Sequence, residues 1–157
     1  MATLKKRIMV DMSATLIHHG HIRLLEQASK FGSVIVGLTT DDEVFGKKHY
    51  HPELAFEFRK EILESIKYVS EVVPTPWLID DDILDKYAID LLMHGSDNSN
   101  SIDPERLQII PRTEGVSSTD MRDRVQRTIT DINNQKLMLT PGPAVVLHEN
   151  VKNLKPL

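Results

Sequence analysis

Short, β-prone apolar runs alternate along the chain with segments whose apolar residues recur at helical spacing. The runs predict buried strands at residues 7–11, 33–40, 70–74, 89–95 and 107–111. The helical spacing predicts helices at residues 21–32, 52–69, 80–89 and 117–132, and the polar stretch 41–51 predicts a loop. Strands that alternate with helices in this way are typical of a parallel sheet covered on both faces.

The apolar positions also predict which face of two helices meets the sheet. The helix at 21–32 carries its apolar face on Ile22, Leu25 and Ala28, and Gly32 is suited to ending it. The helix at 52–69, with Pro52 in its first turn, carries its expected core face on Leu54, Phe58, Ile62, Ile66 and Val69. Arg59 adjoins that face, so its stem is expected to lie along the core while its charged head reaches solvent or a crevice.

Right-handed crossovers favour a doubly wound, Rossmann-like α/β fold with a five-stranded parallel sheet in the order 3-2-1-4-5. Strands one and four are then neighbours at the switch point, where ligands bind outside the carboxyl ends of the strands. "HHGH" (18–21) follows the first strand, "HGSD" (94–97) the fourth, and "RTEGVSST" (112–119) the fifth. Three polar motifs that are distant in the sequence therefore converge on one crevice.

Composition narrows the class of ligand. A net charge of -4 over 157 residues argues against nucleic-acid binding along a phosphate backbone, whereas local clusters of Lys, Arg and His can still bind small anions. The chain has no cysteine, which excludes disulfides, Cys-based zinc sites and a Cys nucleophile. With no signal peptide and no apolar run near the ~20 residues of a membrane span, we expect a cytoplasmic protein.

Three histidines crowd the start of the predicted helix at 21–32. A metal site needs several ligands on one side, and the adjacent His18 and His19 point in different directions. A solvated surface cluster is a second interpretation. A phosphate site is favoured because the free N–H groups of a helix N-terminus attract anions and Gly20 lets the backbone come close.

"RTEGVSST" has the parts of a second phosphate site. Arg112 supplies a forked cation, and Gly115 permits a tight turn. Ser117, Ser118 and Thr119 are suited to capping the helix that follows. An ordinary capped helix after a turn explains the same residues, so both interpretations stay open.

Four further side chains have two interpretations each. Lys47 and Lys48 lie in a polar stretch and are either solvated or contact phosphate. Trp77, the single tryptophan, is either a core edge or a stacking wall. Asp97 either closes an Asx-type turn or binds a cation or nucleotide.

Together these motifs resemble the cytidylyltransferase branch of the nucleotidyltransferase superfamily. "HHGH" has that superfamily's H-x-G-H pattern, with His18 and His21 as motif histidines and His19 as the variable residue. "RTEGVSST" is similar to the branch's R-T-E-G-[IV]-S-T-[TS] motif. "RKEILESIKYVSEVVPTPW" is similar to the segment leading into the third strand, and "IDLLMHGSD" to the "HGxD" of ethanolamine-phosphate cytidylyltransferases. The resemblance covers residues 7 to 125.

The resemblance implies an enzyme that transfers CMP from CTP to a small phosphorylated or phosphonylated alcohol or amine, releasing pyrophosphate, in phosphonate or phospholipid-headgroup biosynthesis. Magnesium would accompany CTP, no residue is expected to ligate a metal, and a homodimer is expected. The implied catalytic residues are His18, His21, Lys47, Lys48 and Arg112. The implied nucleotide and phosphate contacts are Ser13, Gly20, Gly95, Asp97, Arg112, Ser117, Ser118 and Thr119. The implied acceptor contacts are Arg59, Trp77 and Asp97.

The chain departs from the family at residues 12–15. The family usually has Gly-x-Phe-Asp there, whereas this chain has Met12, Ser13, Ala14 and Thr15. This departure keeps a non-catalytic nucleotide-binding module open as an alternative, beside an adenylyltransferase. Among acceptors, 2-aminoethylphosphonate and ethanolamine phosphate are favoured and glycerol 3-phosphate is the alternative, because "HGSDNS" lacks the aromatic side chain that a quaternary ammonium favours.

The C-terminal segment departs from the family altogether. We expect a cytidylyltransferase domain at residues 1–133 and a separate segment at 134–157. "LMLTPGP" (137–143) resembles the opening of class V pyridoxal-phosphate-dependent aminotransferases, including 2-aminoethylphosphonate transaminases. A fusion of the two enzymes would link the acceptor to that amine, and an ordinary C-terminal extension is the alternative.

Overall fold

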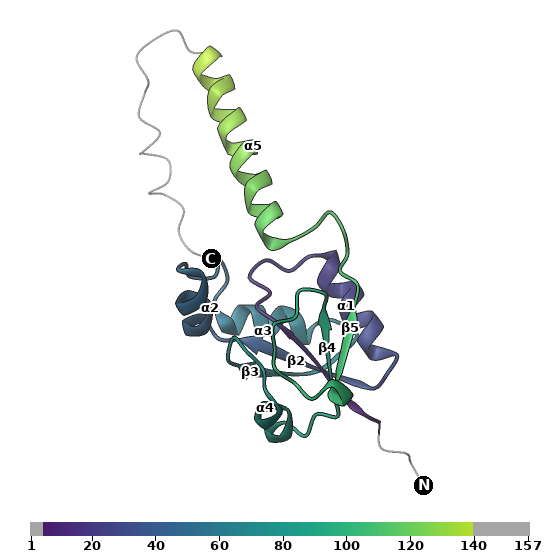
Figure 1. Cartoon of the computed structure of the whole chain (residues 1–157). Helices are drawn as coiled ribbons and strands as arrows, with labels where there is room; N and C mark the ends of the chain where they lie inside the picture. Colours follow the sequence, from purple (N-terminus) through teal and green to yellow (C-terminus); the bar gives the residue numbers. More distant parts are fainter. Residues whose placement is uncertain (1–4, 140–157) are drawn as a thin grey trace. The chain divides into compact units, whose positions relative to one another are not determined.

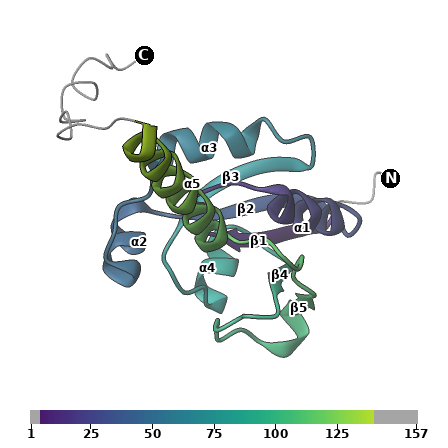
Figure 2. The same cartoon turned by 90° about the horizontal axis from the view of Figure 1, so that it is seen from above.

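The structure, a computed structural model, describes residues 5–139 of a chain that divides into two units, Met1–Ser118 and Thr119–Leu157 (Figure 1). The first unit holds a five-stranded parallel sheet in the order β3-β2-β1-β4-β5, which Figure 2 shows from above. Its strands are β1 (Arg7–Met12), β2 (Ser33–Thr39), β3 (Val69–Thr75), β4 (Leu91–Gly95) and β5 (Leu107–Ile110). The predicted Rossmann-like order 3-2-1-4-5 is confirmed.

The helices are α1 (His19–Ser29), α2 (Asp41–Lys48), α3 (Phe56–Glu64), α4 (Asp81–Lys86), the 3-10 turn η1 (Pro104–Arg106) and α5 (Ser118–Leu139). The described part of the second unit, residues 119–139, lies within α5. The expected domain division at residues 133 and 134 stays a prediction. Most of the "LMLTPGP" segment lies outside the described residues.

The sheet has a separate apolar core on each face. Leu25 of α1 and Leu63 of α3 pack on one face, together with alternate residues of the strands such as Val10. Leu84 of α4 and the residues of opposite alternation, such as Met9, pack on the other face. Because both faces are buried, the strands have nearly continuous apolar sequences. Polar residues are also found at or next to the carboxyl ends of most strands.

The prediction of a loop at 41–51 was wrong, because residues 41–48 form the helix α2. Its first turn holds Asp41, Asp42 and Glu43, and its last turn holds Lys47 and Lys48. Acidic side chains near the N-terminus and basic ones near the C-terminus complement the helix dipole. This order of charges was the sequence signal for a helix. The apolar pattern gave no second signal, because Val44 is the helix's one buried residue.

The predicted core face of the helix at 52–69 was wrong within the helix itself, although Ile66 and Val69, which follow the helix, do pack against the core. The helix spans Phe56–Glu64, so Pro52 precedes it, and Phe58 and Ile62 are exposed. The buried positions are Arg59 and Leu63, each one residue further along. A shift of one residue turns a helix by about 100°, and the hydrogen bonds of the Arg59 guanidinium make this burial of a charged side chain possible.

Candidate active site

Two histidines build the start of α1. His18 is the N-cap residue, and its Nδ1 accepts a hydrogen bond from the backbone N–H of Gly20 at 3.1 Å. Nδ1 of His21 in turn accepts the backbone N–H of His18 at 3.1 Å. This reciprocal arrangement is a capping box, in which imidazoles take the places that Ser or Thr and Glu or Gln usually hold. We call His18, Gly20 and His21 the histidine cradle.

The capping bonds determine which ring nitrogen carries the proton. Nδ1 accepts a backbone N–H in both rings, so each neutral ring carries its proton on Nε2. Burial, His18 and Arg112 lower the pKa of His21 to about 3, and burial, His19 and Arg112 lower the pKa of His18. At neutral pH the histidine cradle therefore offers two uncharged Nε2–H donors rather than two cations.

Gly20 gives the cradle its compact form. A Cβ at this position would lie 2.9 Å from the ring of His18 and 3.2 Å from Cγ1 of Val116. The hydroxyl of Ser118 also donates a hydrogen bond to the carbonyl of Leu16 at 3.0 Å. The segment that contains "RTEGVS" therefore lies against the loop between β1 and α1, as the topology predicted.

Arg112 stands beside the cradle and is paired with Asp97. Its Nη1 donates to Oδ2 of Asp97 at 2.8 Å, and both side chains are about half exposed. A Cβ on Gly95 would lie 2.9 Å from Oδ1 of Asp97 and 3.1 Å from Cγ of Arg112, so glycine leaves room for this pair at the end of β4. Of the predicted contacts, His18, His21, Gly20, Gly95, Asp97 and Arg112 thus lie at the switch point between β1 and β4.

Sequence reasoning missed a buried carboxylate at the same switch point. Oδ2 of Asp11, near the end of β1, accepts a hydrogen bond from Nδ2 of Asn100 at 3.1 Å and lies 3.5 Å from Nε2 of His94 on β4. Oδ1 of Asp11 is buried and has no hydrogen-bond partner among the described residues. Burial raises the pKa of Asp11, against the lowering effects of His94 and Asn100. We call Asp11, His94 and Asn100 the Asp11 cluster.

A signal for this cluster was present in the sequence. Asp11 interrupts the apolar run "RIMVDM", and His94 interrupts "LLMHG". Parallel strands one and four are neighbours in the predicted order, so these polar interruptions at their carboxyl ends are brought together. Asn100 carried no comparable signal, because it lies in a polar stretch between β4 and η1.

Arg59 is completely buried and joins three segments. Its Nε donates to the carbonyl of Leu54 at 3.1 Å, its Nη1 to the carbonyl of Ser13, and its Nη2 pairs with Asp41 at 2.6 Å. The guanidinium therefore ties the loop after β1 to the start of α2. Its predicted contact with an acceptor phosphoryl group stays a prediction.

The residues that depart from the family pattern are packed inside the protein. Met12, Ala14 and Thr15 are 8%, 2% and 0% exposed, and Met12 and Ala14 belong to the core on the α1 side of the sheet. Ala14 has a φ of 43°, in the left-handed region that costs a residue with a Cβ about 1 kcal/mol or more. The loop between β1 and the histidine cradle thus keeps a strained turn.

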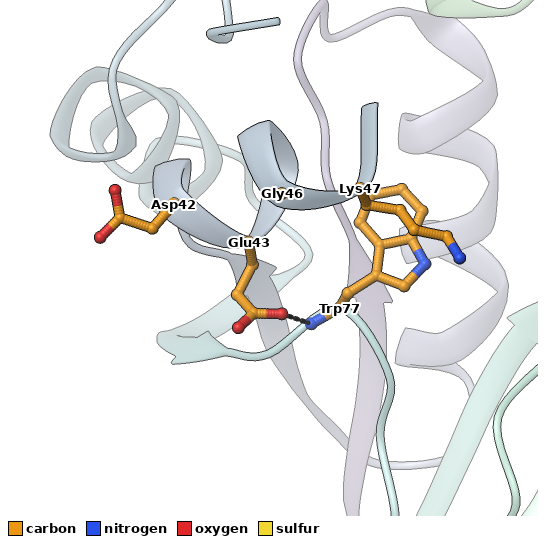
Figure 3. A pocket seen from close by; sticks show the side chains of 5 residues that line it. All are labelled: Asp42, Glu43, Gly46, Lys47 and Trp77. Carbon is orange, nitrogen blue, oxygen red and sulfur yellow. Dashed lines mark hydrogen bonds between the residues drawn. The ribbon is translucent and has the colours of Figure 1, made fainter. Parts of the chain in front are cut away.

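Lys47, Lys48 and Trp77 form a second group, at the end of α2. An open hollow of about 200 Å³ is lined by Asp42, Glu43, Gly46, Lys47 and Trp77. Figure 3 shows how these residues lie around it. Glu43 accepts the backbone N–H of Trp77 at 2.9 Å, and Nζ of Lys48 lies 5.4 Å from the centre of the Trp77 ring. Trp77 is half-buried, so it forms a wall of this hollow rather than part of the core.

Two further residues predicted to contact phosphate, Ser117 and Thr119, differ in their exposure to solvent. Ser117 is half-buried, and Thr119 is the exposed first residue of the second unit, which is described by itself. Among residues 5–139, no group of three or more His, Asp or Glu side chains could hold a metal ion. Within the same range, no helix has the length and apolar character needed to cross a bilayer.

Comparison with known proteins gives relatives that fit this geometry. Glycerol-3-phosphate cytidylyltransferase of Bacillus subtilis (strain 168) is 36% identical over 129 residues, which cover 76% of this chain and 97% of that protein. Ethanolamine-phosphate cytidylyltransferase of Mus musculus is 34% identical over 131 residues, which cover 76% of this chain and 32% of that protein.

A solved structure supports the fold alone. The crystal structure of the lipopolysaccharide core biosynthesis protein from Thermoplasma volcanium GSS1 has a TM-score of 0.59 at 15% identity, covering 69% of this chain and 98% of that one.

The family profile described as "Cytidylyltransferase-like" matches residues 13–124, which include the histidine cradle and Arg112. On the strength of that match and of the two relatives, the chain belongs to the cytidylyltransferase-like family.

Proposed function

We propose that the protein transfers CMP from CTP to a small phosphorylated or phosphonylated acceptor that carries a primary amine, and releases pyrophosphate. The observation that carries the CTP half of the proposal is the histidine cradle, in which two neutral imidazoles cap a helix N-terminus near the Arg112 cation. Helix N-termini with such donors bind phosphate groups. The CTP-dependent transfer is also the activity printed in the names of the relatives.

In the proposed reaction, an oxygen of the acceptor's phosphoryl or phosphonyl group attacks the α-phosphorus of CTP. One P–O bond forms, and the bond from the α-phosphorus to the bridging oxygen breaks, so that the electron pair leaves with pyrophosphate. His18 and His21 would donate Nε2–H bonds to the phosphate oxygens on which negative charge develops. Arg112 would hold the leaving β- and γ-phosphates, for which it must release Asp97.

Lys47 and Lys48, in the last turn of α2, are further candidates for a phosphate contact. Lys47 is exposed and Lys48 is half-buried against Trp77 and Tyr50. We assign the phosphate contact to Lys47 or Lys48 rather than to Arg59, because the guanidinium of Arg59 is enclosed and already bonded to Asp41. An acceptor phosphoryl group would reach Arg59 only after that pair opens.

The donor set around the cradle consists of imidazole N–H groups and a guanidinium, which do not ligate Mg²⁺. Mg²⁺ prefers oxygen ligands and keeps several waters. These residues do not fit a magnesium ion held by the protein. They do fit a triphosphate that brings its own magnesium, and no step in the proposed reaction depends on a protein-bound ion.

Asp11 supports an acceptor with a primary amine. Its unpartnered Oδ1 is a buried acceptor near the end of β1, which pairs with β4 at the switch point. A buried carboxylate oxygen without a partner is costly, and an ammonium group would satisfy it with a charge-assisted hydrogen bond. Asp97 was expected in this role and stays a second candidate, because its carboxylate becomes available once Arg112 turns to the leaving phosphates. This favours ethanolamine phosphate or 2-aminoethylphosphonate as the acceptor.

Glycerol 3-phosphate is the second candidate acceptor. It is favoured by the relatives from Bacillus subtilis and from Staphylococcus aureus (strain NCTC 8325 / PS 47), which are 36% and 34% identical and carry that substrate in their names. A hydroxyl can donate to Oδ1 of Asp11 as an ammonium can, but without the attraction of opposite charges. The two candidates therefore differ in how strongly they depend on the charge of Asp11.

A pyrophosphate-release assay tests the proposal. The protein, CTP and magnesium are combined in turn with ethanolamine phosphate, 2-aminoethylphosphonate, glycerol 3-phosphate and choline phosphate, and each reaction is repeated with ATP. We expect CTP to be used and a primary-amine acceptor to have the highest kcat/KM. Preference for glycerol 3-phosphate would overturn the acceptor, preference for ATP would overturn the nucleotide, and binding of CTP without turnover would indicate a non-catalytic module.

A further inference from the structure

One side chain beyond the active-site motifs ties the Asp11 cluster to its surroundings. Asn100 lies in the loop between β4 and η1, and its side-chain amide has two partners from distant parts of the sequence. Nδ2 donates to Oδ2 of Asp11 at 3.1 Å, and Oδ1 accepts the backbone N–H of the buried Ile79 at 2.8 Å. A single planar amide thus links the end of β1 to the loop between β3 and α4.

The position of Asn100 is itself held by backbone contacts. Its N–H donates to Oδ1 of Asn98, and Nδ2 of Asn98 donates to the carbonyl of Asn100. The next residue, Ser101, forms a parallel bridge with Asp80. Because these contacts fix the backbone on both sides, the Asn100 amide is oriented before any ligand binds.

The fixed Asn100 amide determines the orientation of the Asp11 carboxylate. A carboxylate can rotate about its terminal torsion, which is broad and roughly two-fold. The Asn100 bond to Oδ2 selects one orientation and leaves the buried Oδ1 without a partner. The bond from Ile79 also fixes the other end of the short segment that begins at Trp77, whose own N–H is held by Glu43.

We propose that Asn100 is a positioning residue for acceptor recognition: it orients Asp11 so that Oδ1 faces the ammonium group of the acceptor, and it keeps the segment that carries Trp77 in register with that carboxylate. This inference rests on the proposed amine acceptor. It adds a determinant of specificity in the loop after β4, outside the histidine cradle and the "RTEG" segment.

The positioning role of Asn100 can be measured through the pKa of Asp11, which depends on the groups around that carboxylate. His94 on β4 and the Asn100 amide favour the ionised carboxylate, whereas burial and Asp97 disfavour it. Replacing the Asn100 donor by an oxygen would place a like charge at hydrogen-bond distance from Oδ2, which raises the pKa of Asp11. Only the ionised carboxylate attracts an ammonium group fully, so the acid side of the pH profile should report on this contact.

Asn100→Asp is the informative variant, and Asn98→Asp is its matched control. Asn100→Asp keeps the oxygen that accepts the Ile79 N–H and loses only the donor to Asp11. Asn98→Asp adds the same charge two residues away and likewise keeps its acceptor for the Asn100 N–H, so it loses only the Nδ2 bond to the carbonyl of Asn100 and reports what a local loss of a donor does without touching Asp11. For both variants and the wild type, kcat and KM are measured against pH with ethanolamine phosphate and with glycerol 3-phosphate, and Asp11 is titrated by carboxyl NMR.

We expect Asn100→Asp to move the acid limb of kcat/KM for the amine acceptor upward by about one pH unit, mainly through KM, and to raise the NMR pKa of Asp11. Asn98→Asp should leave both unchanged, and neither variant should shift the profile for glycerol 3-phosphate. An equal shift in the two variants, or no shift in Asn100→Asp, overturns the positioning role. A wild type that does not use the amine acceptor overturns the proposed acceptor instead, and this role with it.

Discussion

The histidine cradle begins a few residues after Asp11, yet the cradle and the Asp11 cluster are built in opposite ways. In the cradle, each ring is held by a backbone N–H within three residues, and its neutral form keeps an Nε2–H that the capping bonds do not use. In the cluster, Asp11 depends on Asn100, which is 89 residues away, and one of its carboxylate oxygens is left without a partner. Local bonds make the cradle self-contained, whereas the cluster exists only in the folded sheet.

This difference has an energetic side. The cradle accepts hydrogen bonds from backbone N–H groups that have no partner within the helix, so its residues stabilise the fold in the absence of a ligand. The cluster buries a carboxylate with incomplete hydrogen bonding, which costs free energy in the absence of a ligand. Losing a capping bond in the cradle should therefore lower stability, whereas removing the buried charge of the cluster should not.

The largest expected effect is on the cradle. His18→Asn and His21→Gln keep an acceptor suited to the N-cap and N3 positions but remove the Nε2–H donor to phosphate. Each should lower kcat/KM by about 10²–10³, the cost of one lost oxyanion-type donor, with a melting temperature close to that of the wild type. Steady-state kinetics and thermal melting measure the two quantities. His19→Ala is the control, and a comparable loss of activity there would contradict the assignment.

The second effect is on the Asp11 cluster. Asp11→Asn removes a negative charge at nearly constant volume, so kcat/KM for an amine acceptor should fall about ten- to a hundredfold, the value of a charge-assisted hydrogen bond. The same variant should melt at an equal or higher temperature, because the buried charge is gone. Competition assays with ethanolamine phosphate and glycerol 3-phosphate measure the change in preference. A fall of equal size for both acceptors would show that Asp11 does not recognise the amine.

The third effect is the pH dependence of stability, which has opposite signs in the two regions. The pKa of His21 is about 3 in the folded protein and 6.5 when unfolded, so the unfolded chain binds more protons in this window and stability falls as the pH falls through it. For Asp11, whose folded pKa is raised above 3.8, acidification has the opposite sign and relieves the burial of charge.

Between pH 7 and pH 5, the wild type should lose about 2 kcal/mol more unfolding free energy than His21→Gln, which keeps the capping bond and does not titrate. Urea denaturation at the two pH values measures this difference. Parallel pH dependences would mean that His21 does not stay neutral in the fold.

The smallest effect concerns the pair that borders both regions. Asp97→Asn releases Arg112 from a half-exposed ion pair, and such pairs contribute less than about 1 kcal/mol. KM for CTP should therefore fall by at most about fivefold, and stability should hardly change. Titration of initial rates with CTP measures this. A rise in KM would indicate that Asp97 contacts the nucleotide directly.

What could be predicted from the sequence follows the same division between local and distant contacts. The strand order and the convergence of "HHGH" with "RTEGVS" follow from alternation and crossover handedness, and both are found in the structure. The face of α3 could not be predicted from spacing alone, because Arg59 is buried by bonds to Ser13 and Asp41, which are distant in the sequence. Asn100 was hidden for the same reason, since its two partners come from other elements.

The capping box in the cradle has a consequence for how the H-x-G-H pattern is interpreted in any chain. The atoms that close the helix, Nδ1 of His18 and Nδ1 of His21, belong to the same rings whose Nε2–H groups are proposed to face phosphate. A descendant that lost its nucleotide would still be under pressure to keep both rings, because the helix start depends on them. In this chain the helix start alone is therefore enough to explain both histidines, whereas evidence of activity has to come from a side chain such as Arg112 that has no capping role.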